Sequence, residues 1–387
     1  MKKDWIRILR EHTERYPLME PQDYGKLIFQ SEFGAEHMIA DEESVQAFLL
    51  REWEELPQSG FSSPKEIEDI GGELCRFPLS ACESEEAAAL LAKLFLLTAQ
   101  DNRKDMSKPE EMPEAAKKSI IGGGIECGAK SGIGKCPEAG ISGDVFKEKI
   151  ERTIKFGISG MEEWVKIWAA QGYPAVHHSM VYRDAYHPHY RLLRKEYAGY
   201  FPALLAILKT VEKRNAVIIA IDGRCGSGKT SLAGLAGRLF NCNIFHMDDY
   251  YLPMAKRVQN WQSVPAGNMD LERFRKEVLL PAKEGQQVVY CPYDCQAGRM
   301  KGKQIFKPSL FTVVEGSYSH HPHLAGEYDL KIFLTCPKEE QESRLRTRER
   351  SRFTAFKEKW IPMEENYFRH FEVEAGSDIV VDTGSFI

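Results

Sequence analysis

The stretch Ala216–Ala233, AVIIAIDGRCGSGKTSLA, decides the fold of the second half of the chain. It begins with β-branched and other apolar residues typical of a buried strand, continues through a glycine-rich turn and ends in a helix-favouring segment. The residues from Gly223 to Thr230 match the pattern G-x-x-x-x-G-K-[ST] in the strand–turn–helix context that this motif requires. The sequence therefore predicts a site for a nucleoside triphosphate.

The chemistry of phosphate binding explains the residue types of this motif. Glycines let backbone N–H groups turn toward phosphate oxygens, and the following helix adds its positive end. We expect Lys229 to reach the β- and γ-phosphates and Thr230 to ligate Mg²⁺. A chance glycine-rich turn is the alternative, which the complete motif disfavours. The predicted nucleotide-binding residues are Gly223, Arg224, Cys225, Gly226, Ser227, Gly228, Lys229, Thr230 and Ser231.

Length and composition indicate a globular protein of two domains. The chain has 387 residues, too many for one ordinary core, and its 43% hydrophobic and 28% charged residues are typical of soluble proteins. The net charge of −5 provides no general basic field, so charge gives no support to wholesale nucleic-acid binding, and we expect no nucleic-acid partner. Nine cysteines without paired C-x-x-C spacing indicate reduced thiols.

The start of the chain and its most apolar stretch bear on its location. Met1–Trp5 has no apolar segment behind its charges, as a secretory signal would have. Ala87–Ala99 is interrupted by Lys93 and is shorter than the about 20 residues that a membrane span needs. We therefore expect a cytoplasmic protein without membrane association.

Sequence patterns divide the chain into a helical part and an α/β part. Residues 1–200 show helical periodicity, and Ala87–Ala99, apolar on nearly every side, predicts a central buried helix. Residues 101–145 are charged and then rich in Gly, Lys and Ser, which indicates a mobile insertion. Residues 201–213 predict a linker helix, and residues 214–387 a phosphate-loop domain.

Two signals in the first part stay open. Cys127 and Cys136 could pair or bind a metal, but two cysteines alone define no site. Residues 176–191, VHHSMVYRDAYHPHYR, hold four histidines, three tyrosines and two arginines. They could form a ligand-binding surface, or they could hydrogen-bond to one another at helix ends and loops.

From Val217 onward, predicted strands alternate with helices, which indicates a parallel sheet covered on both faces. Ligands of such sheets bind at the carboxyl ends of the strands. The strands are expected at Val217–Ile221, Asn243–Met247, Gln287–Tyr290, Phe311–Glu315, Leu330–Thr335 and Ile379–Asp382.

Acids follow two of these strands. Asp248 and Asp249 come after the second strand, where a carboxylate could accept a proton from an attacking hydroxyl or hold Mg²⁺ through water. A helix cap is the alternative role. Glu315 ends a buried strand, where a phosphate-loop protein needs a second carboxylate near Mg²⁺, although an exposed strand-end acid is the alternative.

Arginines gather before the last strand, at positions 344, 346, 348, 350 and 352. In a continuous helix, Arg344, Arg348 and Arg352 would share one face. Such a face can close over a triphosphate as a lid and stabilise the charge on the transferring group. A solvated basic face is the alternative. Arg344 and Arg348 are the predicted catalytic arginines.

Together, these segments resemble the uridine kinase and phosphoribulokinase family over residues 214–387. The likeness lies in the order of the phosphate loop, Asp248-Asp249-Tyr250-Tyr251, Asn268-Met269-Asp270, Pro292-Tyr293-Asp294, Glu315-Gly316 and the arginine-rich stretch. The resemblance implies that Asp248 is the general base and that Tyr251 lines a nucleoside pocket. It further implies that Asp270 binds ribose hydroxyls and that Tyr293 packs on the nucleobase.

The acceptor half departs from the family pattern. Leu271-Glu272 stands where uridine kinases have His-Pro, and no His follows Tyr293-Asp294. His320, within the segment Ser317–His323, could instead bring an imidazole to the acceptor, or it could belong to a polar surface loop.

The predicted activity is phosphoryl transfer from ATP or GTP, with Mg²⁺, to a hydroxyl of a small metabolite. A nucleoside is the leading acceptor, and a non-nucleoside metabolite is the alternative. Another hypothesis is a nucleotide-gated switch whose helical domain binds a partner. A third is a bifunctional chain with a second site at Glu36, His37, Arg76, His178, Arg183 and Arg191. The oligomeric state, a homo-oligomer included, stays open.

Overall fold

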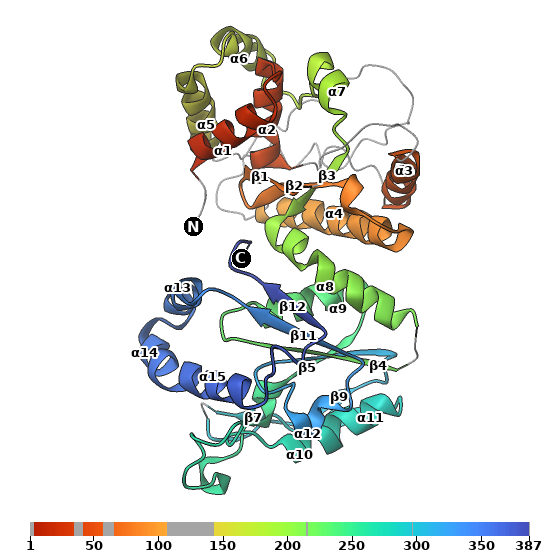
Figure 1. Cartoon of the computed structure of the whole chain (residues 1–387), viewed down its shortest axis with the longest axis vertical. Helices are drawn as coiled ribbons and strands as arrows, with labels where there is room; N and C mark the ends of the chain where they lie inside the picture. The colour runs from red at the N-terminus through yellow and green to blue at the C-terminus, as the bar shows by residue number, and fades with distance from the viewer. Residues whose placement is uncertain are drawn as a thin grey trace. The chain divides into compact units, whose positions relative to one another are not determined.

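The computed structural model describes residues 4–34, 42–56, 66–106, 143–213, 216–295 and 297–386. The chain divides into two compact units, Met1–Ala198 and Gly199–Ile387 (Figure 1). Most of the expected insertion, with Cys127 and Cys136, lies outside the described residues, as do Glu36 and His37. No helix in the described ranges combines the length and apolarity that crossing a membrane requires.

The first unit is mainly helical. Its helices are α1 (Trp5–Arg15), α2 (Pro21–Phe33), α3 (Glu42–Glu55), α4 (Glu85–Met106), α5 (Gly143–Phe156), α6 (Met161–Ala170) and α7 (Met180–Tyr186), with a 3₁₀ turn at Leu79–Ala81, and α8 (Lys195–Val211) crosses into the second unit. Helix α4 contains the apolar stretch Ala87–Ala99. Its alanines and leucines are buried, except for the half-buried Ala89 and Leu97, while Lys93 is exposed, as the pattern predicts.

A three-stranded antiparallel sheet accompanies these helices, and helical periodicity alone missed it. Its order is β1 (Glu68–Gly71), β2 (Leu74–Pro78) and β3 (Tyr190–Arg194). Strands β1 and β2 form a hairpin, whereas β3 joins β2 from more than a hundred residues away. Strands this short carry little periodic signal, and a pairing over such a separation leaves no local trace.

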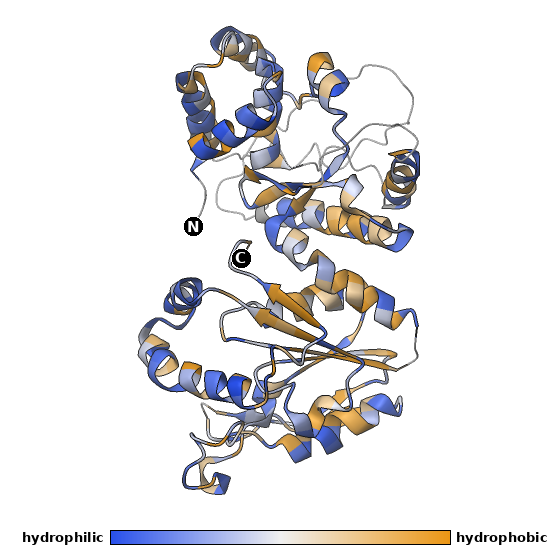
Figure 2. Cartoon of the chain, in the orientation of Figure 1, coloured by the Kyte–Doolittle hydropathy of each residue, from blue (hydrophilic) through white to orange (hydrophobic). Residues whose placement is uncertain are grey.

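The second unit contains a five-stranded parallel sheet in the order β12-β11-β4-β10-β5. The strands are β4 (Val217–Gly223), β5 (Asn243–His246), β10 (Phe311–Glu315), β11 (Leu330–Thr335) and β12 (Ile379–Asp382). Every residue of β4 is buried, and Figure 2 shows the sheet strands as largely hydrophobic. The predicted α/β class of the phosphate-loop type is confirmed.

Helices and smaller elements surround this sheet. The α-helices are α9 (Lys229–Phe240), α10 (Leu271–Phe274), α11 (Leu280–Lys283), α12 (Pro322–Ala325), α13 (Lys338–Glu349), α14 (Phe353–Ala355) and α15 (Ile361–His370). Short 3₁₀ and π segments are η5 (Met247–Tyr250), η6 (Met254–Lys256), η7 (Arg275–Leu279), η8 (Arg350–Arg352) and η9 (Phe356–Trp360). Figure 1 shows α9 and α11 on opposite faces of the sheet.

One expected sheet strand belongs elsewhere. The segment expected at Gln287–Tyr290 forms β6 (Val288–Tyr290), which pairs antiparallel with β9 (Gln304–Phe306) in a separate two-stranded sheet. A short apolar run predicts a strand but does not say which strand it pairs with. Another small ribbon joins β7 (Tyr293–Asp294) to β8 (Arg299–Met300).

Strand order fixes the position of the candidate site. In the sheet, β10 and β5 lie on one side of β4, and β11 and β12 lie on the other side. The carboxyl end of β4 is therefore the point where the order reverses, and ligands of open parallel sheets bind at such points. The glycine-rich loop follows β4 at this position.

Substitution of Gly223 by Ala should destabilise the second unit. Its φ is +140°, and an added Cβ would lie 2.0 Å from the carbonyl oxygen of Leu334. We expect backbone strain and overlap with β11 to lower the free energy of unfolding by about 3 kcal/mol or more, measured in urea. Gly285→Ala is the matched control, because Gly285 has φ +64° with open space around it and should cost about 1 kcal/mol. Equal losses in the two variants would contradict this explanation.

Candidate active site at the carboxyl ends of the strands

The phosphate loop joins β4 to α9 through three glycines with positive φ. These are Gly223, Gly226 and Gly228, with φ of +140°, +78° and +92°. In the described part of the chain, the N–H groups of Gly226, Gly228 and Lys229 donate to no protein acceptor. Unpaired N–H groups at the start of a helix are suited to phosphate oxygens.

The side chains of this loop also suit a triphosphate. Lys229 Nζ donates to the carbonyl oxygens of Gly223 at 2.6 Å and Arg224 at 3.0 Å, so the ammonium lies directly over the loop. The buried hydroxyl of Ser227 has no hydrogen-bond partner among the described residues. An ammonium, a hydroxyl and several N–H groups together form a donor set for an anion, which fits the predicted nucleotide.

Two acids of α15 brace this loop, and sequence reasoning missed both. Glu364 accepts hydrogen bonds from the N–H of Cys225 at 3.0 Å and from Ser317 Oγ at 2.6 Å. Burial raises the pKa of Glu364, while the nearby Lys229 opposes that rise. Arg224 extends to Glu365, with Nε to Oε1 at 2.7 Å, so its side chain anchors the loop. No motif links residues so far apart in sequence.

Thr230 and Glu315, the two predicted metal ligands, lie together. Thr230 Oγ1 donates to Glu315 Oε1 at 3.3 Å, and His246 Nδ1 shares a hydrogen bond with the same oxygen at 2.6 Å. That hydrogen bond raises the pKa of His246 above its ordinary value. His246 lies beside Glu315 because β5 and β10 pair in parallel register.

The donor set at Thr230 and Glu315 fits Mg²⁺ bound to a nucleotide. Nowhere in the described ranges do three or more His, Cys, Asp or Glu side chains form a group that could hold a metal. Magnesium commonly takes one or two protein ligands and completes its shell with phosphate oxygens and water. One hydroxyl and one carboxylate next to the phosphate loop match this requirement.

Asp248 belongs to the same cluster. It lies in η5, directly after β5, and its carboxylate is open to solvent although protein atoms crowd around it. This crowding raises the pKa of Asp248, whereas the hydrogen bond that Tyr251 donates to Oδ1 at 3.0 Å lowers it. The charges of Lys229 and Glu315 also act on this carboxylate. The predicted base thus lies within electrostatic reach of the phosphate loop.

The neighbouring Asp249 has a different role. Its Oδ2 accepts a hydrogen bond from Tyr290 at 2.8 Å, and this tyrosine belongs to the hydrophobic core. The two adjacent acids therefore make different contacts, which the sequence alone could not predict. Asp249 supports β6, whereas the carboxylate of Asp248 interacts with the charge of Lys229 in the phosphate loop.

The predicted arginine face is interrupted. Helix α13 ends at Glu349, and Arg350 adopts a positive φ of +48°, so Arg352 falls in η8. The expectation that Arg352 continues the face of Arg344 and Arg348 is wrong, because the i, i+4 rule applies only within a continuous helix.

The two predicted catalytic arginines differ in their contacts. Arg344 donates to the carbonyl oxygen of Gly226 at 3.2 Å and to that of Thr383 at 2.8 Å, which fastens the loop to the C-terminal segment. Arg348 is 56% exposed and pairs through Nε with Glu349. Burial raises the pKa of the Cys225 thiol, and the charge of Arg348 opposes that rise.

The predicted acceptor residues lie around η5, with the exception of His320. Asp270 caps α10, accepting the N–H of Arg273 at 3.3 Å, and Tyr293 lies half-buried in β7. His320 is buried, with its ring nitrogens 3.1 Å from Ser377 Oγ and 3.2 Å from the carbonyl oxygen of Ala220. Burial lowers the pKa of His320. Its imidazole supports β4 and does not face the acid cluster.

An aromatic cluster begins at Tyr251, whose hydroxyl bonds to Asp248. Tyr251 lies 6.4 Å from Trp360 between ring centroids, and Trp360 lies 6.4 Å from Trp261. Arg257 stacks over Trp261 at 4.4 Å, and the Lys359 ammonium lies 4.8 Å from the same ring. Both tryptophans escaped sequence analysis because they are about a hundred residues apart and match no motif.

The His/Tyr/Arg stretch 176–191 lies in the first unit and makes many internal hydrogen bonds. His178 is buried between Asp23 and Tyr190, at 2.9 Å and 2.8 Å. Arg191 and His189 both bind Glu52, at 2.6 Å and 2.7 Å. These contacts agree with the second alternative for this stretch, in which its polar side chains hydrogen-bond within the protein.

Comparisons with known proteins give partial, distant matches. No family model and no curated protein matches the sequence. One similar solved structure is a protein from Bacillus stearothermophilus described as a possible uridine kinase, at 21% identity and TM-score 0.38, covering 47% of this chain and 98% of that chain. Another is a protein from Silicibacter sp. TM1040 that is provisionally described as a fructose transport system kinase. It has 19% identity and a TM-score of 0.39, and the match covers 46% of this chain and 97% of that chain. At these sequence identities and TM-scores the comparisons carry no argument about function, which must be argued from the residues of the site.

Proposed function

We propose that this chain transfers the γ-phosphoryl group of ATP or GTP to a hydroxyl of a small metabolite, with a nucleoside as the leading acceptor. The observation that supports this proposal is that the charges of Lys229 and Glu315 both act on the Asp248 carboxylate, while Thr230 donates to Glu315. A nucleotide-gated switch needs a phosphate site but no base aimed at a second substrate. A base next to the donor site is what a kinase needs.

Each side chain of the cluster has a separate task in this proposal. Asp248 accepts the proton of the attacking hydroxyl at a carboxylate oxygen, with Tyr251 holding that carboxylate in place. Lys229 and Arg348 stabilise negative charge on the transferring group. Thr230 and Glu315 hold Mg²⁺, which when bound neutralises charge on the phosphate oxygens. Arg344 and Glu364 fix the shape of the loop.

The aromatic side chains support a planar acceptor. Tyr251 bonds to Asp248 and belongs to an aromatic cluster with Trp360 and Trp261, and aromatic rings stack readily on a nucleobase. Arg257 and Lys359 lie over the same rings and provide donors for acceptor oxygens. In the same region Asn268 has a fully buried side-chain amide without a hydrogen-bond partner in the described residues. We propose Asp270 and Tyr293 as secondary acceptor contacts.

Substitution of Tyr251 by Phe should move the acidic limb of the pH profile. The Tyr251 hydroxyl lowers the pKa of Asp248, so its removal leaves that pKa still higher. A base works only when deprotonated, and the variant should therefore need a higher pH to reach full activity. Measurement of kcat/KM against pH would show this shift, with the alkaline limb as an internal control. An unmoved acidic limb would contradict the role of Tyr251.

A screen for the acceptor tests the proposed function. The purified chain would be incubated with ATP or GTP, Mg²⁺ and a panel of nucleosides, sugars and vitamin precursors, and phosphorylated products would be identified by mass spectrometry. We expect one nucleoside to give the highest kcat/KM. A best substrate without a planar ring would reject the acceptor class but keep the kinase.

A further inference from the structure

Two positive side chains lie on one tryptophan of the second unit. The guanidinium carbon of Arg257 is 4.4 Å from the centroid of the Trp261 ring, and the Lys359 ammonium is 4.8 Å from the same centroid. Trp261 is buried and both cations are half-buried, so water screens their repulsion less than it would at an open surface. Two like charges on one ring are costly unless an anion joins them.

No carboxylate in the described part of the chain neutralises these two cations. The ion pairs that the described residues form include neither Arg257 nor Lys359. Lys357 lies in the same segment η9 as Lys359, but it pairs with Glu342 at 3.1 Å. An aromatic ring attracts a cation without cancelling its charge. Arg257 and Lys359 therefore have positive charge to offer to a ligand.

Arg257 is held in place while its terminal nitrogens stay free. Its Nε donates to the carbonyl oxygen of Leu252 at 2.8 Å, and its guanidinium lies over Trp261. Neither Nη1 nor Nη2 donates a hydrogen bond to a residue that the structure describes. Two such N–H donors side by side match the two oxygens of a carboxylate.

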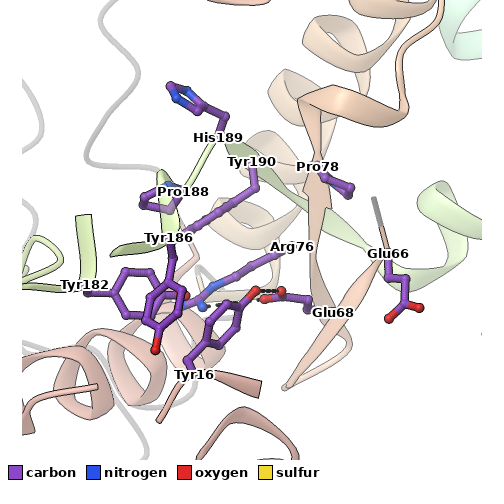
Figure 3. A pocket seen from close by; sticks show the side chains of 10 residues that line it. All are labelled: Tyr16, Glu66, Glu68, Arg76, Pro78, Tyr182, Tyr186, Pro188, His189 and Tyr190. Carbon is purple, nitrogen blue, oxygen red and sulfur yellow. Dashed lines mark hydrogen bonds and ion pairs between the residues drawn. The ribbon is translucent and has the colours of Figure 1, made fainter. Parts of the chain in front are cut away.

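A charged cluster of the first unit shows the contrast. Figure 3 shows Arg76 beside Glu68, and Arg76 Nη1 lies 3.7 Å from Glu68 Oε2. The cavity that these two side chains line with tyrosines has about 20 Å³ of free space, room for about one water molecule. The charge of Arg76 is therefore balanced by a neighbouring acid, whereas Arg257 and Lys359 have no such partner among the described residues.

An aromatic cluster connects the two cations with the predicted base. Tyr251 donates to Asp248 at 3.0 Å, and its ring centroid lies 6.4 Å from that of Trp360. The centroid of Trp360 lies 6.4 Å from that of Trp261. Two ring-to-ring steps therefore separate the tyrosine that holds the base from the tryptophan that carries the cations. An acceptor with a hydroxyl at one end and a charged ring at the other suits this arrangement.

The Cys295 thiol is subject to the charges at both ends of this cluster. Burial raises the pKa of this thiol, the charge of Arg257 lowers it, and the charge of Asp248 raises it further. Arg257 and Asp248 thus act on one common side chain. This agrees with a single acceptor region that contains both of them.

We propose that the acceptor is a planar molecule that carries a carboxylate on its ring, and that Arg257 and Lys359 bind this carboxylate. The inference rests on the proposed kinase function, in which Asp248 receives the proton of the acceptor hydroxyl. The carboxylate accepts hydrogen bonds from the free guanidinium nitrogens and from the Lys359 ammonium, and it offsets the repulsion between the two cations. A neutral ring leaves both charges without a partner. A carboxylate also lies in the plane of its ring, which suits a stacked position better than a tetrahedral phosphate does.

Binding of matched nucleosides to the full chain tests this proposal. 5-Carboxyuridine and orotidine carry the carboxylate at two positions of one ring, and 5-carbamoyluridine and uridine are their neutral counterparts. In calorimetric titrations we expect at least one carboxylate to bind about tenfold or more tightly than its counterpart, and added salt to narrow the difference. Equal or tighter binding of both neutral nucleosides, or binding of none of the four, would overturn the proposal.

Arg257→Met and Lys359→Met locate the carboxylate. Each variant removes one charge while keeping a long apolar side chain on the tryptophan, so the preference for the carboxylate should fall about fivefold or more. Lys357→Met is the matched control, because Lys357 already has Glu342 as its partner, and the preference should change less than about twofold. An undiminished preference in both test variants would reject Arg257 and Lys359 as the anion site.

Arg257→Lys separates charge from loop structure. Lysine keeps the positive charge but cannot reproduce the fixed guanidinium fork or its contact with Leu252, so it should restore part of the preference that Arg257→Met loses. If Arg257→Lys lost the preference as completely as Arg257→Met, Arg257 would only support the loop, and its role as an anion ligand would be rejected.

Phosphoryl transfer distinguishes failure of this inference from failure of the kinase. The full chain would be given 5-carboxyuridine or 5-carbamoyluridine with ATP and Mg²⁺, and kcat/KM would be compared. A higher kcat/KM for the carboxamide would overturn the inference and keep the kinase. Transfer to neither nucleoside, combined with tighter carboxylate binding that Arg257→Met weakens, would reject the kinase and keep the anion site.

Discussion

Replacement of Asp248 by Asn should lower kcat by about a hundredfold or more while nucleotide affinity stays nearly unchanged. The amide keeps the size of the side chain and can still accept the Tyr251 hydrogen bond, but it cannot take the proton of an attacking hydroxyl. Because Asp248 makes no hydrogen bond to the phosphate loop, donor binding should not depend on it. Single-turnover kinetics with equilibrium nucleotide titration would measure both quantities.

The adjacent acid provides a close control for this experiment. Asp249→Asn keeps an acceptor for the Tyr290 hydroxyl and lies away from the phosphate loop, so kcat should change less than threefold. Equal losses in the two variants would indicate damage to η5 and not the loss of a base. Full turnover in Asp248→Asn would reject the assignment of Asp248.

Replacement of Lys229 by Met should lower kcat/KM by about a hundredfold to a thousandfold. The methionine side chain is similar in length but has no charge, so it cannot stabilise the phosphoryl group as charge develops on it. The ammonium also bonds to the carbonyl oxygens of Gly223 and Arg224, so we expect weaker nucleotide binding as the loop loses these contacts. Steady-state kinetics and fluorescent-nucleotide titration would check both effects.

Lys276→Met separates this effect from a general loss of positive charge. Lys276 is 66% exposed and bridges Glu272 one turn away, so its loss should leave kcat/KM within about twofold of the wild type. If Lys229→Met also kept its activity, the phosphate loop would not be the donor site.

Much of the second unit could be predicted from its sequence because the signals are local. The run Val217–Ile221 and the loop after it specify a strand, a turn and a helix by residue type alone. Glu315 could be placed because a buried strand ends there. Since parallel strands align their carboxyl ends, residues after separate strands could be expected to share one site.

What the sequence could not supply depends on contacts between distant segments. Trp261 and Trp360 meet across about a hundred residues, and His320 turns inward because Asp222 accepts its N–H. Arg352 leaves the predicted helical face because Arg350 breaks the helix. None of these outcomes is contained in local spacing.

The first unit shows the same limit more strongly. Its strand β3 comes from a stretch whose histidines and tyrosines suggested loops and helix ends. The pairing of β3 with β2 brings Tyr190 to Arg76. Arg76 is one of six residues in the predicted second site, and among those that the structure describes, His178 joins its network through Tyr190.

The central claim, phosphoryl transfer to a hydroxyl, can be tested by phosphorus NMR of one reaction. The full chain would be incubated with ATP, Mg²⁺ and a mixture of nucleosides, and the fate of the γ-phosphorus would be followed over time. The proposed function predicts a new phosphomonoester resonance that appears as ADP forms and that is lost with Asp248→Asn. Slow release of inorganic phosphate alone, the same in the wild type and the variant, would contradict the kinase assignment and favour a nucleotide-gated switch.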